Sequence, residues 1–150
     1  MKRMLAVVLF LLLLVPLPAV AGGLEDFLSN VNVQARVDLP GFSAKISNQF
    51  GVPLPQVQAV VRSVREPADA FMVFQLGQFS GRQPERVMEI YEFSRGKGWG
   101  VIAKRLGIKP GSAEFHALKS GNLSFTGQPA GYDDTPGKGR GKGKGRGHNK

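Results

Sequence analysis

Basic side chains that could bind an anion are concentrated in two segments of this 150-residue chain. Residues 95–119 hold six bases and a single acid, Glu114, so the segment carries a formal charge of +5. Residues 136–150 hold six bases and no acid. Clustered Lys and Arg are typical of surfaces that bind polyanions. We therefore expect anion binding by Arg95, Lys97, Lys104, Arg105, Lys109 and Lys119, and by Lys138, Arg140, Lys142, Lys144, Arg146 and Lys150.

The C-terminal segment 136–150 alternates bases with glycine, which occupies every second position from 137 to 147. It has no apolar side chains to offset the entropy cost of ordering, and its charges repel one another. We therefore expect a disordered tail. Its expected partners are an anionic envelope polymer, a membrane surface or an acidic protein. A tail that only increases solubility is the competing interpretation.

Three carboxylates share one face of a predicted helix, at Glu85, Glu89 and Glu92. Paired carboxylates can hydrolyse glycosides, so an enzyme acting on the cell wall is one hypothesis. Arg82 and Arg86 lie within one turn of these acids, which favours a solvated, ion-paired face instead.

Other reactive residue types are scarce. The chain has no Cys, which excludes disulfides, Cys-ligated zinc, iron–sulfur clusters and thiol catalysis. Its two histidines, His116 and His148, are isolated, and no serine has an Asp–His arrangement nearby. We predict no catalytic residue, no cofactor and no metal site, and hence a protein that is not an enzyme.

The N-terminus has the features of a secretory signal peptide. A positively charged start precedes an unbroken apolar run over residues 4–15, and Ala19 and Ala21 supply small residues before a cleavage site at Gly22. A 12-residue helix covers about 18 Å, less than the ~30 Å hydrocarbon core of a bilayer. We predict export to the periplasm or the extracellular space, with an uncleaved anchor as the alternative.

Between residues 22 and 121 the sequence predicts short helices separated by Gly and Pro. The segment that begins at Pro67 is apolar on all sides and should be the buried centre. β-branched residues are frequent around Val60, so a strand is the alternative there. The remaining apolar stripes lie at residues 24–31, 42–50, 57–64, 87–91, 99–106 and 115–118.

A weak internal repeat supports helical hairpins. Phe50-Gly51-Val52 resembles Leu106-Gly107-Ile108, and in each the glycine can end a helix in the left-handed conformation. We predict an all-α fold, a small orthogonal bundle of about six to seven short helices over residues 22–121. Residues 122–150 are predicted to be a disordered linker and basic tail.

Residues 99–118 are also similar to a DNA-reading helix-turn-helix. Export argues against that function, and the candidate recognition helix has no Arg, Asn or Gln for bidentate base readout. Nucleic-acid binding is therefore an alternative hypothesis. The preceding Gly96-Lys97-Gly98-Trp99-Gly100 could hold a phosphate or carboxylate, but the favoured interpretation is a flexible turn in which Trp99 anchors the core.

The run GKGWGVIAKRLGIKPGSAEFHALK, residues 96–119, resembles a stretch of a group of small, exported, uncharacterised bacterial proteins. The likeness extends over residues 22–121, with a variable Gly- and charge-rich tail after it. The resemblance implies export and a helical fold, and it transfers no catalytic residue. The overall expectation is an exported binding or structural protein that contacts anionic polymers or an acidic partner.

Overall fold

The computed structural model describes residues 22–129, which form seven helices and no strand. The predicted all-α class is confirmed. The predicted cleavage residues Ala19 and Ala21 and the bases of segment 136–150 lie outside the described residues. The helices are α2 (Gly23–Val37), α3 (Leu39–Phe50), α4 (Leu54–Ser63), α5 (Pro67–Ser80), α6 (Pro84–Phe93), α7 (Trp99–Arg105) and α8 (Ala113–Ser120).

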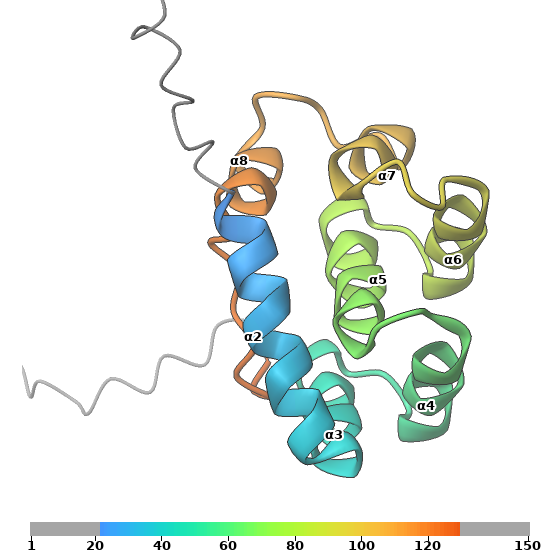
Figure 1. The fold of residues 1–150 in the computed structure, drawn as a ribbon. Helices are drawn as coiled ribbons and strands as arrows, with labels where there is room; N and C mark the ends of the chain where they lie inside the picture. Colours follow the sequence, from blue (N-terminus) through green and yellow to red (C-terminus); the bar gives the residue numbers. More distant parts are fainter. Residues whose placement is uncertain (1–21, 130–150) are drawn as a thin grey trace, which may run out of the picture.

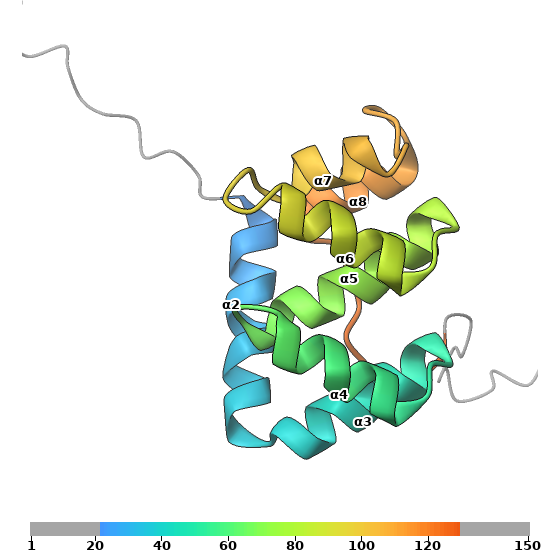
Figure 2. The same ribbon diagram turned by 90° about the vertical axis from the view of Figure 1, so that its right-hand side faces the viewer.

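Helix α5 is the centre of the bundle, as its uniformly apolar sequence predicts. Every residue from Ala70 to Gly77 is buried, and α5 contacts α2, α3, α4 and α6. Figures 1 and 2 show α2 along one side of the molecule, with the α3–α4 hairpin at one end and α6, α7 and α8 at the other. Burial on all sides explains why this segment has no polar face.

Proline and side-chain caps begin most of the helices. The carboxylate of Asp38 accepts a hydrogen bond from the backbone N–H of Gly41, and the hydroxyl of Ser112 accepts one from Phe115. Glu66 and Asp69 form a reciprocal capping box at the start of α5. These interactions satisfy N–H groups that have no partner within the helix. The segment around Val60 is the helix α4, so the alternative of a strand there was wrong.

The predicted glycine turns recur at both copies of the internal repeat. Gly51 has φ 64° and Gly107 has φ 89°. The N–H of the following residue then bonds back five positions, from Val52 to Ser47 at 3.1 Å and from Ile108 to Ala103 at 3.0 Å. This pattern ends a helix and folds the next apolar residue onto it.

The prediction of a disordered linker from residue 122 is wrong for residues 122–129, because these residues have defined contacts with the domain. Leu123 and Phe125 pack against the core. The Phe125 ring lies 5.3 Å from that of Phe42 and 5.6 Å from that of Phe71. Gln49 accepts hydrogen bonds from the N–H groups of residues 126 and 127. The folded unit therefore extends past residue 121.

None of the helices within residues 22–129 is long and apolar enough to cross a lipid bilayer.

Candidate functional site

Three of the predicted anion-binding residues line one cleft. Lys97 lies in the α6–α7 turn, Lys104 near the end of α7, and Lys119 in the last turn of α8. The cleft has a volume of about 550 Å³ and is closed on its third side by the start of α2. Glu25 is the single acidic residue in its lining. The lining is therefore cationic, with three positive side chains against one negative one.

The rest of the lining is apolar. Leu24, Val101, Trp99 and Phe115 contribute to it, and the Nζ of Lys104 lies 5.9 Å from the centroid of the Phe115 ring. The three lysines are exposed, so their ammonium groups remain hydrated. A cationic rim over an apolar floor can accept an anionic group together with the carbon skeleton that carries it.

The backbones at the start of α2 and the end of α8, which border the cleft, lie very close to each other. A Cβ atom on Gly23 would lie 2.1 Å from the carbonyl oxygen of Ser120, and one on Gly121 would lie 2.1 Å from the carbonyl oxygen of Gly23. Only glycine permits this contact between the start of α2 and the end of α8. It brings Lys119 and Glu25, which are far apart in the sequence, into the lining of one cleft.

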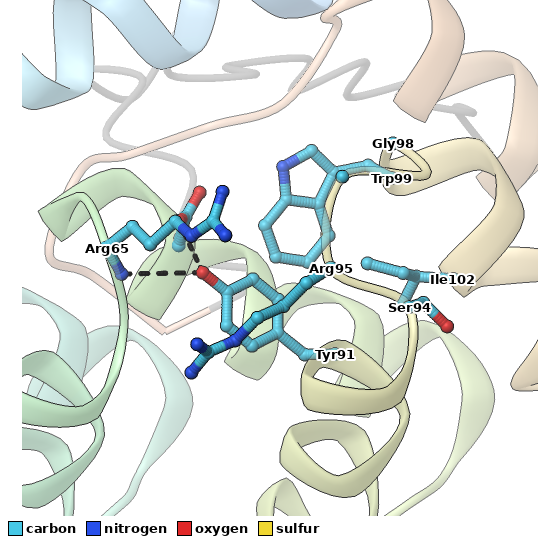
Figure 3. Close-up of a pocket in the computed structure, with 9 residues that line it drawn as sticks. Arg65, Tyr91, Ser94, Arg95, Gly98, Trp99 and Ile102 are labelled. Carbon is cyan, nitrogen blue, oxygen red and sulfur yellow. Dashed lines mark hydrogen bonds between the residues drawn. The ribbon is translucent and has the colours of Figure 1, made fainter.

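A second cavity, of about 310 Å³, adjoins the cleft. Gly98 and Trp99 line both. Figure 3 shows Arg65 and Arg95 on either side of Tyr91, with the Trp99 indole above it. The Tyr91 and Trp99 rings are stacked, with centroids 5.5 Å apart. The core-anchoring interpretation of Trp99 agrees with this stack, and the indole also borders both cavities.

Hydrogen bonds fix the wall of the second cavity. The Tyr91 hydroxyl donates to Oδ2 of Asp69 at 2.7 Å and accepts from the backbone N–H of Arg65 at 3.4 Å (Figure 3). Burial and the hydrogen bond to Asp69 raise the pKa of Tyr91 to about 12. The phenol is therefore protonated at neutral pH and acts as a donor to Asp69, not as a base. The Oγ of Ser94, which also lines this cavity, is buried without a hydrogen-bond partner.

The predicted bases are not all brought together. Arg95 lies in the second cavity and forms an ion pair with Glu92. Arg105 turns away and places its guanidinium carbon 4.9 Å from the centroid of the exposed Phe93 ring. Lys109 is exposed in the α7–α8 turn and lines neither cavity. The six bases of segment 136–150 are outside the described residues.

Arg65, Glu25 and Gly22 belong to the two cavities but were not predicted as binding residues; Gly22 was predicted only as the residue at the cleavage site. Gly22 and Glu25 line the cleft, and Arg65 lines the second cavity. No local pattern identifies them, because each reaches its cavity only through tertiary packing. Arg65 has no ion pair within residues 22–129.

The three carboxylates proposed for hydrolysis line a shallow groove between α4 and α6. Each has a partner: Glu85 accepts from Gln56 Nε2 at 2.6 Å, Glu89 pairs with Arg86 at 2.6 Å, and Glu92 pairs with Arg95. This arrangement favours the ion-paired interpretation, with Arg95 in the place expected for Arg82. Exposed pairs of this kind contribute little to stability.

Residues 99–118, which were compared with a helix-turn-helix, form helix α7, the following turn and most of α8, and the two helices contact each other. Ile102 and Ala103 are buried where the helices meet, and α8 also packs against α2. The outer face of α8 presents His116 and Lys119. Lys119 is directed to the cleft shared with α2, so the hairpin contributes to the cleft and does not form a free recognition helix.

Within residues 22–129 no group of three or more potential ligands is placed to hold a metal ion. Comparisons of the chain with family models, curated proteins and solved structures found no match. The resemblance to exported bacterial proteins therefore stays a prediction.

Proposed function

We propose that this protein is an exported, non-enzymatic binding protein that holds an anionic polymer of the cell envelope in the cleft between α2, α7 and α8. The observation that carries the proposal is the convergence of Lys97, Lys104 and Lys119 on one cleft with a single opposing acid. Three cations that reach one cavity from two helices and a turn form a far more specific anion site than the same charges spread over a surface.

The second cavity extends this basic surface. Arg65 and Arg95 line it together with Asp69, and it shares Gly98 and Trp99 with the lysine-lined cleft. A ligand with repeated anionic groups can engage both cavities at once, whereas a single small anion can engage only one. A polymer therefore suits this surface better than an isolated ion.

The basic tail supports the same function. It supplies six further bases without an acid. Linking two weakly binding segments raises the effective concentration of each at the ligand. In this proposal the cleft determines how the polymer is held, and the tail increases its rate and strength of capture.

The test is binding of heparin, used as a soluble polyanionic probe, to two full-length variants of equal net charge. One carries Lys97→Gln, Lys104→Gln and Lys119→Gln. The control carries Arg62→Gln, Arg82→Gln and Lys109→Gln, all exposed and outside both cavities. Each lost contact should reduce the slope of log affinity against log salt by roughly 0.9 for a polymer with the charge density of duplex DNA.

We expect the cleft variant to lose about two to three units of slope and at least tenfold in affinity, and the control to lose much less. Equal losses in the two variants would show that only total charge matters and would contradict the proposal. Binding to vesicles of phosphatidylglycerol, with no binding to heparin under the same conditions, would also contradict it.

A further inference from the structure

The first described residue, Gly22, lies at the rim of the lysine-lined cleft. It is the N-cap of α2 and lines the cleft together with Lys97, Lys104 and Lys119. Figure 2 shows the start of α2 beside the turn between α6 and α7, and Figure 1 shows it beside α8. This is also the residue at which the sequence predicts that the signal peptide is removed.

We propose that cleavage after Ala21 completes the anion site, because the α-amino group freed on Gly22 becomes its fourth cation. This inference rests on the proposed function. While residue 21 is attached, the nitrogen of Gly22 is a neutral amide. Hydrolysis by water, catalysed by a leader peptidase, gives a carboxylate on Ala21 and an amine on Gly22. That amine takes up a proton to become an ammonium group below its pKa.

The new charge acts directly on the one acid in the cleft. A Cβ atom on Gly22 would lie 3.2 Å from Oε2 of Glu25, so that carboxylate is next to the new terminus. An ammonium group on Gly22 offsets the charge of Glu25. The formal charge of the lining side chains and terminus rises from +2 to +3 on cleavage. The cleft therefore binds anions more strongly in the processed protein than in the precursor.

The α-amino group also gives the site a pH dependence that lysine alone does not give. An α-amino group has an ordinary pKa of about 7.7–8.0 and a lysine one of about 10.4. The charged groups that line the cleft are Glu25 from α2, Lys97 from the α6–α7 turn, Lys104 from α7 and Lys119 from α8. As pH rises from about 6.5 to 9.5, the α-amino group passes through its ordinary pKa range and loses its charge.

The experiment compares three proteins that all end at residue 150. One starts at Gly22, one is the same chain acetylated on the Gly22 nitrogen, and one starts at Val20 and so keeps the amide between residues 21 and 22. Their affinity for a defined heparin oligosaccharide is measured at pH 6.5 and at pH 9.5 over a range of salt. Two further proteins start at Gly22 and carry the three Lys→Gln substitutions of the cleft. One of them is acetylated on the Gly22 nitrogen and the other is not.

We expect acetylation to weaken binding about three- to tenfold at pH 6.5 and to reduce the salt slope by about one unit. The chain from Val20 should be weakened as well, and all three affinities should converge at pH 9.5. Acetylation should have little effect in the cleft variant.

Equal affinities of the free and acetylated forms at pH 6.5 would overturn this inference. If the unacetylated cleft variant still binds less tightly than its charge-matched control, the proposed function survives that outcome. If the cleft variant binds as tightly as the unsubstituted chain, the proposed function fails as well, so the two failures are distinguishable.

Discussion

The hydroxyl of Tyr91 donates a hydrogen bond to Oδ2 of Asp69 at 2.7 Å, and this bond joins α6 to the first turn of α5. The same carboxylate oxygen accepts from the backbone N–H of Glu66 at 3.4 Å as part of the capping box. The Asp69 side chain therefore both caps the start of α5 and holds α6 against it. The bond also fixes the Tyr91 ring, on which the Trp99 indole stacks. The indole borders both cavities.

Replacing Tyr91 by Phe should lower the free energy of unfolding by about 2 kcal/mol, because a hydrogen bond to a half-buried carboxylate is lost. The measurement is urea denaturation at pH 7. A double-mutant cycle with Asp69→Ala isolates the pair, since Tyr91→Phe removes the donor and Asp69→Ala removes the acceptor of the same hydrogen bond. Additive losses in the double variant would show that the two side chains do not interact in solution.

The titration of Tyr91 should also differ from that of an exposed tyrosine. Its pKa is raised to about 12, whereas in the unfolded chain it is about 10. Between these values the unfolded state binds fewer protons, so the stability contributed by Tyr91 is fully present below pH 10 and is lost as pH rises toward 12. Tyrosinate absorbance measures this in the Tyr132→Phe variant, which leaves Tyr91 as the single tyrosine. Titration of the folded variant near pH 10 would contradict the buried hydrogen bond.

Alanine at Gly121 should be far more destabilising than alanine at Gly51. Both glycines have positive φ, 68° and 64°, so both substitutions share the cost of a left-handed alanine, about 1 kcal/mol. Only at Gly121 would the new Cβ meet another backbone, 2.1 Å from the carbonyl oxygen of Gly23, whereas Gly51 faces open space. We expect an additional loss of about 2 kcal/mol, measured by urea denaturation. Similar losses at the two positions would mean that α2 and α8 are not in close contact.

Phe125 should stabilise the domain although it follows the last helix. Its ring contacts those of Phe42 and Phe71, and the Nζ of Lys45 lies 5.4 Å from its centroid. Phe125→Ala should cost about 2–3 kcal/mol, below the range for a fully buried Phe because the ring is partly exposed. Gln128→Ala, at an exposed position, is the matched control and should have almost no effect. Thermal unfolding of both variants checks the difference.

The helices could be predicted because their signals are local. Pro67 and Pro84 begin α5 and α6, and Gly51 and Gly121 end α3 and α8. The packing of residues 122–129 could not be predicted in this way. Leu123 and Phe125 are isolated apolar residues without helical periodicity, and their contacts are made with distant parts of the chain.

The site could be predicted only in part, for the same reason. The basic character of residues 95–119 is visible in the sequence, but the selection of Lys97, Lys104 and Lys119 from that set depends on the turn of the α7–α8 hairpin. Their opposing acid, Glu25, lies on α2 and reaches the cleft through the glycine contact between α2 and α8. Charge composition identifies a basic segment, whereas the fold determines which bases act together.

The most direct test of the central claim is to locate the bound polyanion on the protein. The chain from Gly22 to Lys150, labelled with ¹⁵N, is titrated with a heparin oligosaccharide, and the backbone amide signals are followed by NMR. We expect changes at residues 22–25, 97–104 and 115–119, together with those of the tail, while α3 and α4 are unaffected. Changes confined to residues 136–150 would contradict the cleft as the binding site.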